Sequence, residues 1–176
     1  MVVSQNPPFL MTWFADAAIK TDHLDLPVRQ VYCWVCTLDN KIILVSKDGT
    51  SWQFPGGHPE ESEQPLATCL REVKEETGID LAKHANDIKM FGYYIVNKYN
   101  TVTSQEDRFV QIRLAIKLNE VSANLKLRPQ EHSEEKSSEK INFVAAVSLD
   151  DGCKKIPWLQ NSKELQTFIL TNINFE

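Results

Sequence analysis

The stretch GGHPEESEQPLATCLREVKEETGI, residues 56–79, decides how this chain folds. Its two leading glycines can adopt backbone conformations closed to other residues, so they predict a tight loop. After a polar segment, apolar side chains recur at helical spacing and predict a helix from Gln64 to Thr77, with Gly78 suited to the position just after its end. The residues expected along its buried stripe are Leu66, Leu70, Val73 and Thr77.

Three glutamates lie together on another side of this predicted helix. At 100° per residue, with Leu66 at 0°, Glu75, Glu72 and Glu76 fall at about 180°, 240° and 280°. Like charges three or four residues apart destabilise a helix, and acids in its last turn oppose the helix dipole. A divalent cation relieves both effects, and Mg²⁺ prefers oxygen ligands. The face is therefore a candidate metal site, and a solvated charged face without function is the alternative.

Outward from this stretch, short β-like runs predict a mixed sheet flanked by helices, which places the chain in the α/β class with an α+β-type sheet. Val28 to Thr37 and Lys41 to Ser46 form a predicted hairpin around the Asp39-Asn40 turn. Further strands are expected at Trp52–Phe54, Ile88–Val96, Phe109–Leu118 and Ile141–Ser148, and a last helix from Ser162 to about Asn172. Residues 1–27 read as an N-terminal extension with a short helix over 13–19, and residues 28–176 as the main domain.

The length, composition and net charge of the chain argue against several classes of function. The chain has 176 residues with 42% apolar residues and a net charge of −5, which fits one domain without a general pull towards nucleic acid or anionic membrane. No leader-like segment and no run of roughly 20 apolar residues is present, so a cytoplasmic protein is expected. The oligomeric state stays open, with a homodimer among the options.

Two of the four cysteines, Cys33 and Cys36, form a C-x-x-C motif. Such a motif serves in redox chemistry or as half of a zinc site. Here it lies in a β-like run, where residues three apart point to opposite faces, and no second pair completes four ligands. We expect two thiols that pack as small hydrophobic side chains.

The order Gly57, five residues, Glu63, seven residues, then Arg71 to Ile79 matches every specified position of the Nudix box. The chain thus resembles Nudix hydrolases over most of residues 28–172. The resemblance implies a Nudix-type α/β/α sandwich with a mixed central sheet and a catalytic helix. It also implies an essential metal ion, Mg²⁺ with Mn²⁺ as the alternative.

The resemblance assigns roles to residues of the box. Glu75 and Glu76 would bind the metal, Glu72 would act as ligand or base, and the carbonyl of Gly56 would be a further ligand. Arg71 would hold the acids by ion pairing, with Glu63 and Gly78 structural. In such proteins an additional acid outside the box often serves as ligand or base. The candidates for it here are Glu106, Asp107, Glu134 and Glu139.

The expected reaction follows from the repulsion between diphosphate oxygens and an attacking water. A bound metal ion neutralises this charge and lowers the pKa of the water, and a carboxylate accepts the proton. We therefore expect hydrolysis of a diphosphate linkage in a nucleoside triphosphate or nucleoside-diphosphate conjugate, with release of a nucleoside monophosphate or phosphate ester. The partner would be this small molecule, with neither nucleic acid nor membrane.

Substrate contacts are weakly marked in the sequence. His58, Trp52 and Glu139 are candidates, and Tyr93 and Tyr94 could stack on a base, although aromatic residues more often pack in the sheet. Arg29, Lys41 and Lys47 read as scattered surface cations. Two other functions are weighed: a Nudix-like module that senses a nucleotide without cleaving it, and a prenyl-diphosphate isomerase. The intact acids argue against the first, and Cys69 is poorly placed for the second.

Overall fold

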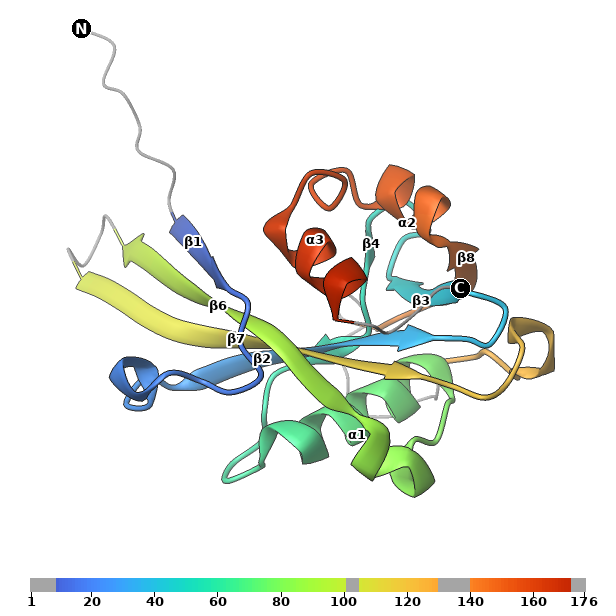
Figure 1. Cartoon of the computed structure of the whole chain (residues 1–176), viewed down its shortest axis with the longest axis horizontal. Helices are drawn as coiled ribbons and strands as arrows, with labels where there is room; N and C mark the ends of the chain where they lie inside the picture. The colour runs from blue at the N-terminus through green and yellow to red at the C-terminus, as the bar shows by residue number, and fades with distance from the viewer. Residues whose placement is uncertain (1–8, 101–104, 130–139, 172–176) are drawn as a thin grey trace, which may run out of the picture.

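The computed structural model describes residues 9–100, 105–129 and 140–171. They form one eight-stranded sheet in the order β1-β6-β7-β2-β3-β4, with β5 paired to β2 and β8 paired to β3 (Figure 1). The strands are β1 (Phe9–Phe14), β2 (Val28–Cys36), β3 (Lys41–Ser46), β4 (Trp52–Gln53), β5 (Gly56–Gly57), β6 (Lys89–Asn100), β7 (Gln105–Lys117) and β8 (Phe143–Ser148). The helices are α1 (Pro65–Thr77), α2 (Leu149–Lys155) and α3 (Lys163–Leu170), with 3-10 turns η1 (Thr21–His23), η2 (Ala82–Asp87) and η3 (Ser122–Asn124).

The sheet is mixed and covered on both faces. Strand β2 runs parallel to β7, whereas β6 and β7, and β3 and β8, pair antiparallel. Helix α1 lies on one side of the sheet and helices α2 and α3 on the other (Figure 1). The predicted α/β/α sandwich with a mixed central sheet is confirmed.

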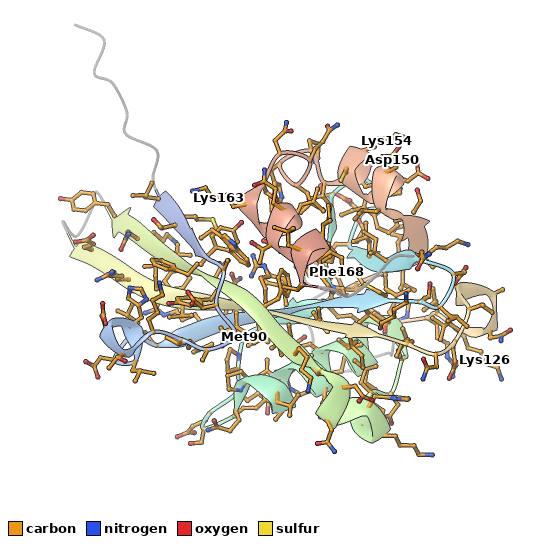
Figure 2. The ribbon with its side chains drawn as sticks, viewed as in Figure 1. Met90, Lys126, Asp150, Lys154, Lys163 and Phe168 are labelled. Carbon is orange, nitrogen blue, oxygen red and sulfur yellow. The ribbon has the colours of Figure 1, made fainter. Side chains whose placement is uncertain are left out.

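Two hydrophobic cores follow from the alternation of side chains along the strands. In β7, Val110, Ile112 and Leu114 point towards α1 and join the core that holds Cys69 and Val73. The opposite face packs Trp34 against Phe168 of α3, at 4.0 Å between ring centroids. Figure 2 shows Phe168 on the side of α3 that faces the sheet. The strand predicted over Phe109–Leu118 therefore forms within β7, apart from its last residue.

The two C-x-x-C thiols lie on opposite faces of β2, as predicted. Cys33 belongs to the core beneath α1 and Cys36 to the core beneath α3. A hydrogen bond with Cys69 and burial raise the pKa of Cys33, and burial raises the pKa of Cys36 to about 12. Both side chains therefore behave as buried apolar groups.

Helix α1 forms where predicted, but its buried side differs. Thr68, Cys69, Val73 and Thr77 are the buried residues, whereas Leu66 is 41% exposed. The preceding loop folds back onto the first turns, because the hydroxyl of Thr68 donates to Oε2 of Glu63 at 2.9 Å. This contact buries the polar Thr68, and the stripe predicted to include Leu66 is wrong at that position.

The helix predicted over residues 13–19 is wrong, because the N-terminal segment is extended. Strand β1 pairs antiparallel with β6 at the edge of the sheet. Phe14 stacks on Tyr93 at 5.1 Å on one face, and Trp13 lies 4.8 Å from Tyr94 on the other. The segment is thus a strand of the domain, stabilised by partners about eighty residues away in sequence. Among the described residues, no helix has the length and apolar character needed to cross a bilayer.

Candidate active site

The glycine loop is held against the sheet before it enters α1. In β5, Gly56 lies beside Tyr32 of β2, and Gly57 lies beside Val31. Gly56 has φ +149°, and a Cβ there would lie 2.1 Å from the Val31 carbonyl oxygen. Only glycine fits so close to the neighbouring strand, which is why the sequence needs this residue at the loop.

Arg71 connects the loop to the acids of α1. Its Nε and Nη2 donate to the two carboxylate oxygens of Glu63 at 3.0 and 2.9 Å, a bidentate pair. Its Nη1 donates to Glu72 at 2.9 Å and to Glu75 at 3.2 Å, and Nη2 also donates to the carbonyl of His58 at 3.0 Å. Arg71 therefore lies at the centre of the cluster and ties three acids to the glycine loop.

Glu72 and Glu76 meet the loop directly. The amide of Gly56 donates to Oε2 of Glu76 at 2.8 Å. A Cβ on Gly57 would lie 2.3 Å from Oε1 of Glu72, so the loop backbone approaches this carboxylate closely. Burial raises the pKa of Glu72; Arg71 lowers it, and the nearby charges of Glu75 and Glu63 raise it. A partly buried carboxylate beside other carboxylates is an environment that an additional cation would stabilise.

The chemistry of this cluster fits a hard divalent cation. Carboxylates of Glu72, Glu75 and Glu76 and the carbonyl of Gly56 supply the oxygen donors that Mg²⁺ prefers. In the described part of the chain, no three acidic, histidine or cysteine side chains converge as a ready-made metal site. Two of the three helix acids instead contact Arg71, and the third accepts the Gly56 amide. Metal binding would therefore have to turn these carboxylates away from Arg71 and from the Gly56 amide.

A large cavity opens on the face of the sheet that carries α3, and we call it the aromatic pocket. Its volume is about 1170 Å³, enough for a nucleotide. Tyr32 connects the pocket with the acids, because its ring lines the pocket and lies near the Cβ position of Gly56. The pocket is lined by Met11, Thr12, Trp13, Arg29, Gln30, Tyr32, Trp52, Gln53, Phe54, His58, Tyr94, Val96, Lys98, Asp107, Phe109, Gln111, Arg113, Trp158, Ser162 and Lys163.

Two candidate substrate contacts line this pocket. His58 is exposed at its rim, and Trp52 is half-buried with the ammonium group of Lys155 at 4.2 Å from its ring centroid. Tyr94 also lines the pocket. Tyr93 points to the other face, where it is fully buried and its hydroxyl lies 2.8 Å from Nδ1 of His23, so it cannot stack on a ligand.

The candidate acids outside the box fall in different places. Asp107 lines the pocket and pairs with Arg29 at 2.5 Å, while Glu106 is exposed on the same strand. Glu134 and Glu139 lie outside the described residues. Of the surface cations, Lys41 pairs with Asp39 at 3.4 Å, outside the residues that line the pocket.

Sequence reasoning missed the residues that close the pocket. Arg113 of β7, which the sequence did not single out, is 5% exposed and forms an ion pair with the buried Glu164 of α3. Trp13 donates from Nε1 to the hydroxyl of Thr167, so β1 and α3 meet over the sheet. An arginine within a strongly apolar strand is the one signal that pointed to this arrangement.

Comparisons with known proteins identify the family of this domain. The model of the NUDIX domain matches residues 26–163. An m7GpppN-mRNA hydrolase of Saccharomyces cerevisiae is 34% identical over 62 residues, which cover 35% of this chain and 6% of that protein. An 8-oxo-dGTP diphosphatase of Proteus vulgaris is 35% identical over 54 residues, which cover 28% of this chain and 48% of that protein. The chain thus spans less than half the length of these curated relatives.

A solved structure of a Bacillus subtilis pyrophosphohydrolase shows the same fold. It has a TM-score of 0.53 and 21% identity, and the match covers 77% of this chain and 70% of that one. The family model covers most of the present chain, and the glycine loop, Arg71 and the helix acids lie within the matched residues. The chain therefore belongs to the Nudix domain family.

Proposed function

We propose that this chain is a divalent-cation-dependent pyrophosphohydrolase that cleaves a diphosphate linkage in a nucleoside triphosphate or nucleoside-diphosphate conjugate. The observation that carries the proposal is the grouping of Glu72, Glu75 and Glu76 beside the Gly56-Gly57 turn, next to a pocket of nucleotide size. Two relatives, named m7GpppN-mRNA hydrolase and 8-oxo-dGTP diphosphatase, support a hydrolytic function of this kind.

The residues of the box would have different roles in the reaction. Glu72, Glu75, Glu76 and the carbonyl of Gly56 would hold Mg²⁺ or Mn²⁺, which when bound neutralises phosphate charge and lowers the pKa of water. Glu72, which lies against the backbone of Gly57, would act as a metal ligand or as the base that accepts the proton of the attacking water. Arg71 fixes the directions of Glu72 and Glu75 through its two ion pairs.

The aromatic pocket would hold the nucleoside part of the substrate. Its aromatic walls offer faces for a base, and Lys98 and Lys163 line it with positive charge that suits phosphate groups. Attack of water on phosphorus then breaks the bond to the bridging oxygen and releases a nucleoside monophosphate or an equivalent phosphate ester.

A substrate panel tests this proposal. The purified chain would be incubated with Mg²⁺ or EDTA and with nucleoside triphosphates, nucleotide sugars, dinucleoside polyphosphates, and RNA oligomers that carry a 5′-triphosphate or a cap. Chromatography would measure the products. Metal-dependent release of a monophosphate from at least one small nucleotide supports the proposal. Cleavage of the RNA oligomers alone would shift the substrate class to RNA, and tight binding without hydrolysis would favour a nucleotide sensor.

A further inference from the structure

A single arginine at the wall of the aromatic pocket is held in an unusual setting. Arg113 of β7 lines the pocket and is only 5% exposed. Its guanidinium carbon lies 4.7 Å from the ring centroid of Tyr32 and 5.1 Å from that of Tyr94. Its Nε donates to Oε1 of Glu164 at 3.0 Å. The planar group is therefore fixed between two rings and one carboxylate before any ligand binds.

The charge of Arg113 is matched within the protein. Glu164 has no exposed surface, and its Oε1 also accepts from the indole of Trp34 at 2.9 Å. Within the ranges that the structure describes, Oε2 of Glu164 has no hydrogen-bond partner, so Arg113 is the main compensation for this buried charge. A neutral ion pair attracts phosphate weakly, and Lys98 and Lys163 of the same pocket suit that task better.

Arg113 nevertheless keeps donors to offer. Each of its two terminal nitrogens carries two N–H groups. Among the described residues their contacts are long, 3.3 Å from Nη1 to the carbonyl of Ile112 and 3.5 Å from Nη2 to the side chain of Gln111. Hydrogen bonds of this length are weak, so the outer edge of the guanidinium is available to two neighbouring uncharged acceptors.

Gln111, a neighbouring side chain that could read a base edge, is already engaged. A glutamine amide can pair with adenine through one donor and one acceptor. In Gln111, however, Nε2 donates to Gln30, and Oε1 faces Nη2 of Arg113. At this position the wall therefore presents the donors of Arg113 and not the donor–acceptor pair of a free glutamine amide.

We propose that Arg113 recognises the O6/N7 edge of a guanine or hypoxanthine base, so that the enzyme prefers 6-oxopurine nucleotides over adenine nucleotides. This inference rests on the proposed function, because it names the base of the same substrate. Arginine pairs with guanine through two parallel hydrogen bonds to O6 and N7, whereas adenine carries a donor at the corresponding position. Trp158, which is 56% exposed at the same pocket, offers an aromatic face for the base.

The wild-type protein alone can test the base preference. We expect kcat/KM with Mg²⁺ for GTP and ITP to agree within about threefold, because neither contact involves the 2-amino group, and to exceed that for ATP by about 10- to 100-fold. 7-Deaza-GTP lacks the N7 acceptor and should lose about 10-fold. 8-Oxo-dGTP has a hydrogen on N7 and 7-methyl-GTP a methyl group there, so both should be poor substrates. Equal rates for GTP and ATP, or unimpaired 7-deaza-GTP, would overturn the inference.

Binding separates this inference from the proposed function. Calorimetry in EDTA with GMP, IMP and AMP measures base recognition whether or not the chain hydrolyses anything. Tighter binding of GMP and IMP than of AMP supports the role of Arg113 even if no nucleotide is cleaved. Equal affinities, or no binding of any of the three, would refute it even if hydrolysis is observed.

Arg113→Lys is the matching variant, with Arg29→Lys as its control. Lysine keeps a positive charge beside Glu164 but lacks the paired donors, so the preference for GTP over ATP should fall to within about threefold. Arg29→Lys changes another arginine of the pocket, which pairs with Asp107, and should keep the preference. An unchanged preference in Arg113→Lys would contradict the assignment. Should that variant fail to fold, the comparison of GTP with 7-deaza-GTP on the wild type still tests whether the protein recognises N7.

Discussion

Replacing Gly57 by alanine should damage catalysis while sparing the fold. A Cβ at this position would lie 2.3 Å from Oε1 and 2.6 Å from Cδ of Glu72. To restore an ordinary contact the carboxylate must move by about 1 Å, and a displacement of that size at a reacting group costs about 100-fold in rate. The side chain of Glu72 can rotate away, so the loss of stability should stay below about 1.5 kcal/mol, the value of one hydrogen bond to Arg71.

Gly56→Ala is the matched comparison, because the same methyl group one residue earlier meets backbone. Its Cβ would lie 2.1 Å from the Val31 carbonyl oxygen, at φ +149°. Strands β2 and β5 would have to separate, which should cost about 3 kcal/mol or more. Thermal unfolding and steady-state hydrolysis would be measured on both variants. Near-normal kcat in Gly57→Ala, or equal destabilisation of the two variants, would refute this reading of the loop.

Three further predictions concern other parts of the molecule. The bidentate bond with Arg71 lowers the pKa of Glu63 from 4.5 to about 2, so its stabilisation is full above pH 4.5 and disappears as the pH falls towards 2. Urea titrations should show Glu63→Gln destabilised by about 1 kcal/mol at pH 6 and matching the wild type near pH 2, and a pH-independent difference would contradict this. Thiol labelling of the native protein near pH 8 should modify the half-buried Cys153 well before the buried Cys36, whose pKa is raised to about 12. Mass spectrometry measures the order of labelling, and earlier labelling of Cys36 would contradict this prediction. Trp13→Ala should lower the free energy of unfolding by about 3 kcal/mol, because it removes a packed ring, and should raise KM, because Trp13 lines the pocket. An unchanged melting temperature would show that the domain does not need this contact of β1.

The sequence alone was sufficient for the helix of the box and its acids, because both depend on spacing within a few turns. Glu72, Glu75 and Glu76 share a face of α1 wherever the helix packs, and Arg71 is one turn away from Glu75. The strands with strong alternation were predicted for the same reason. Leu66 shows the limit of such reasoning, since it is 41% exposed although it lies at the spacing of the buried stripe.

The parts that sequence reasoning missed depend on distant partners. The run FLMTWF forms a strand because β6 offers a free edge, and nothing within that run identifies this partner. The role of Arg113 could not be predicted, because the sequence of β7 does not show that Glu164 of α3 would pair with it. The aromatic pocket is assembled from residues of β1, β2, β4, β6, β7 and the start of α3, so its composition appeared only in the folded chain.

The central claim is that the glutamates of α1 bind a divalent cation that enables hydrolysis of a diphosphate bond. The most direct measurement is the Mg²⁺-dependent rate of nucleotide hydrolysis in Glu76→Gln, with the exposed Glu61→Gln as the control. Glutamine can still accept the hydrogen bond of the Gly56 amide, so the fold should persist while turnover falls by about 1000-fold or more. Glu61→Gln should match the wild type. Wild-type turnover in a folded Glu76→Gln protein would contradict the account.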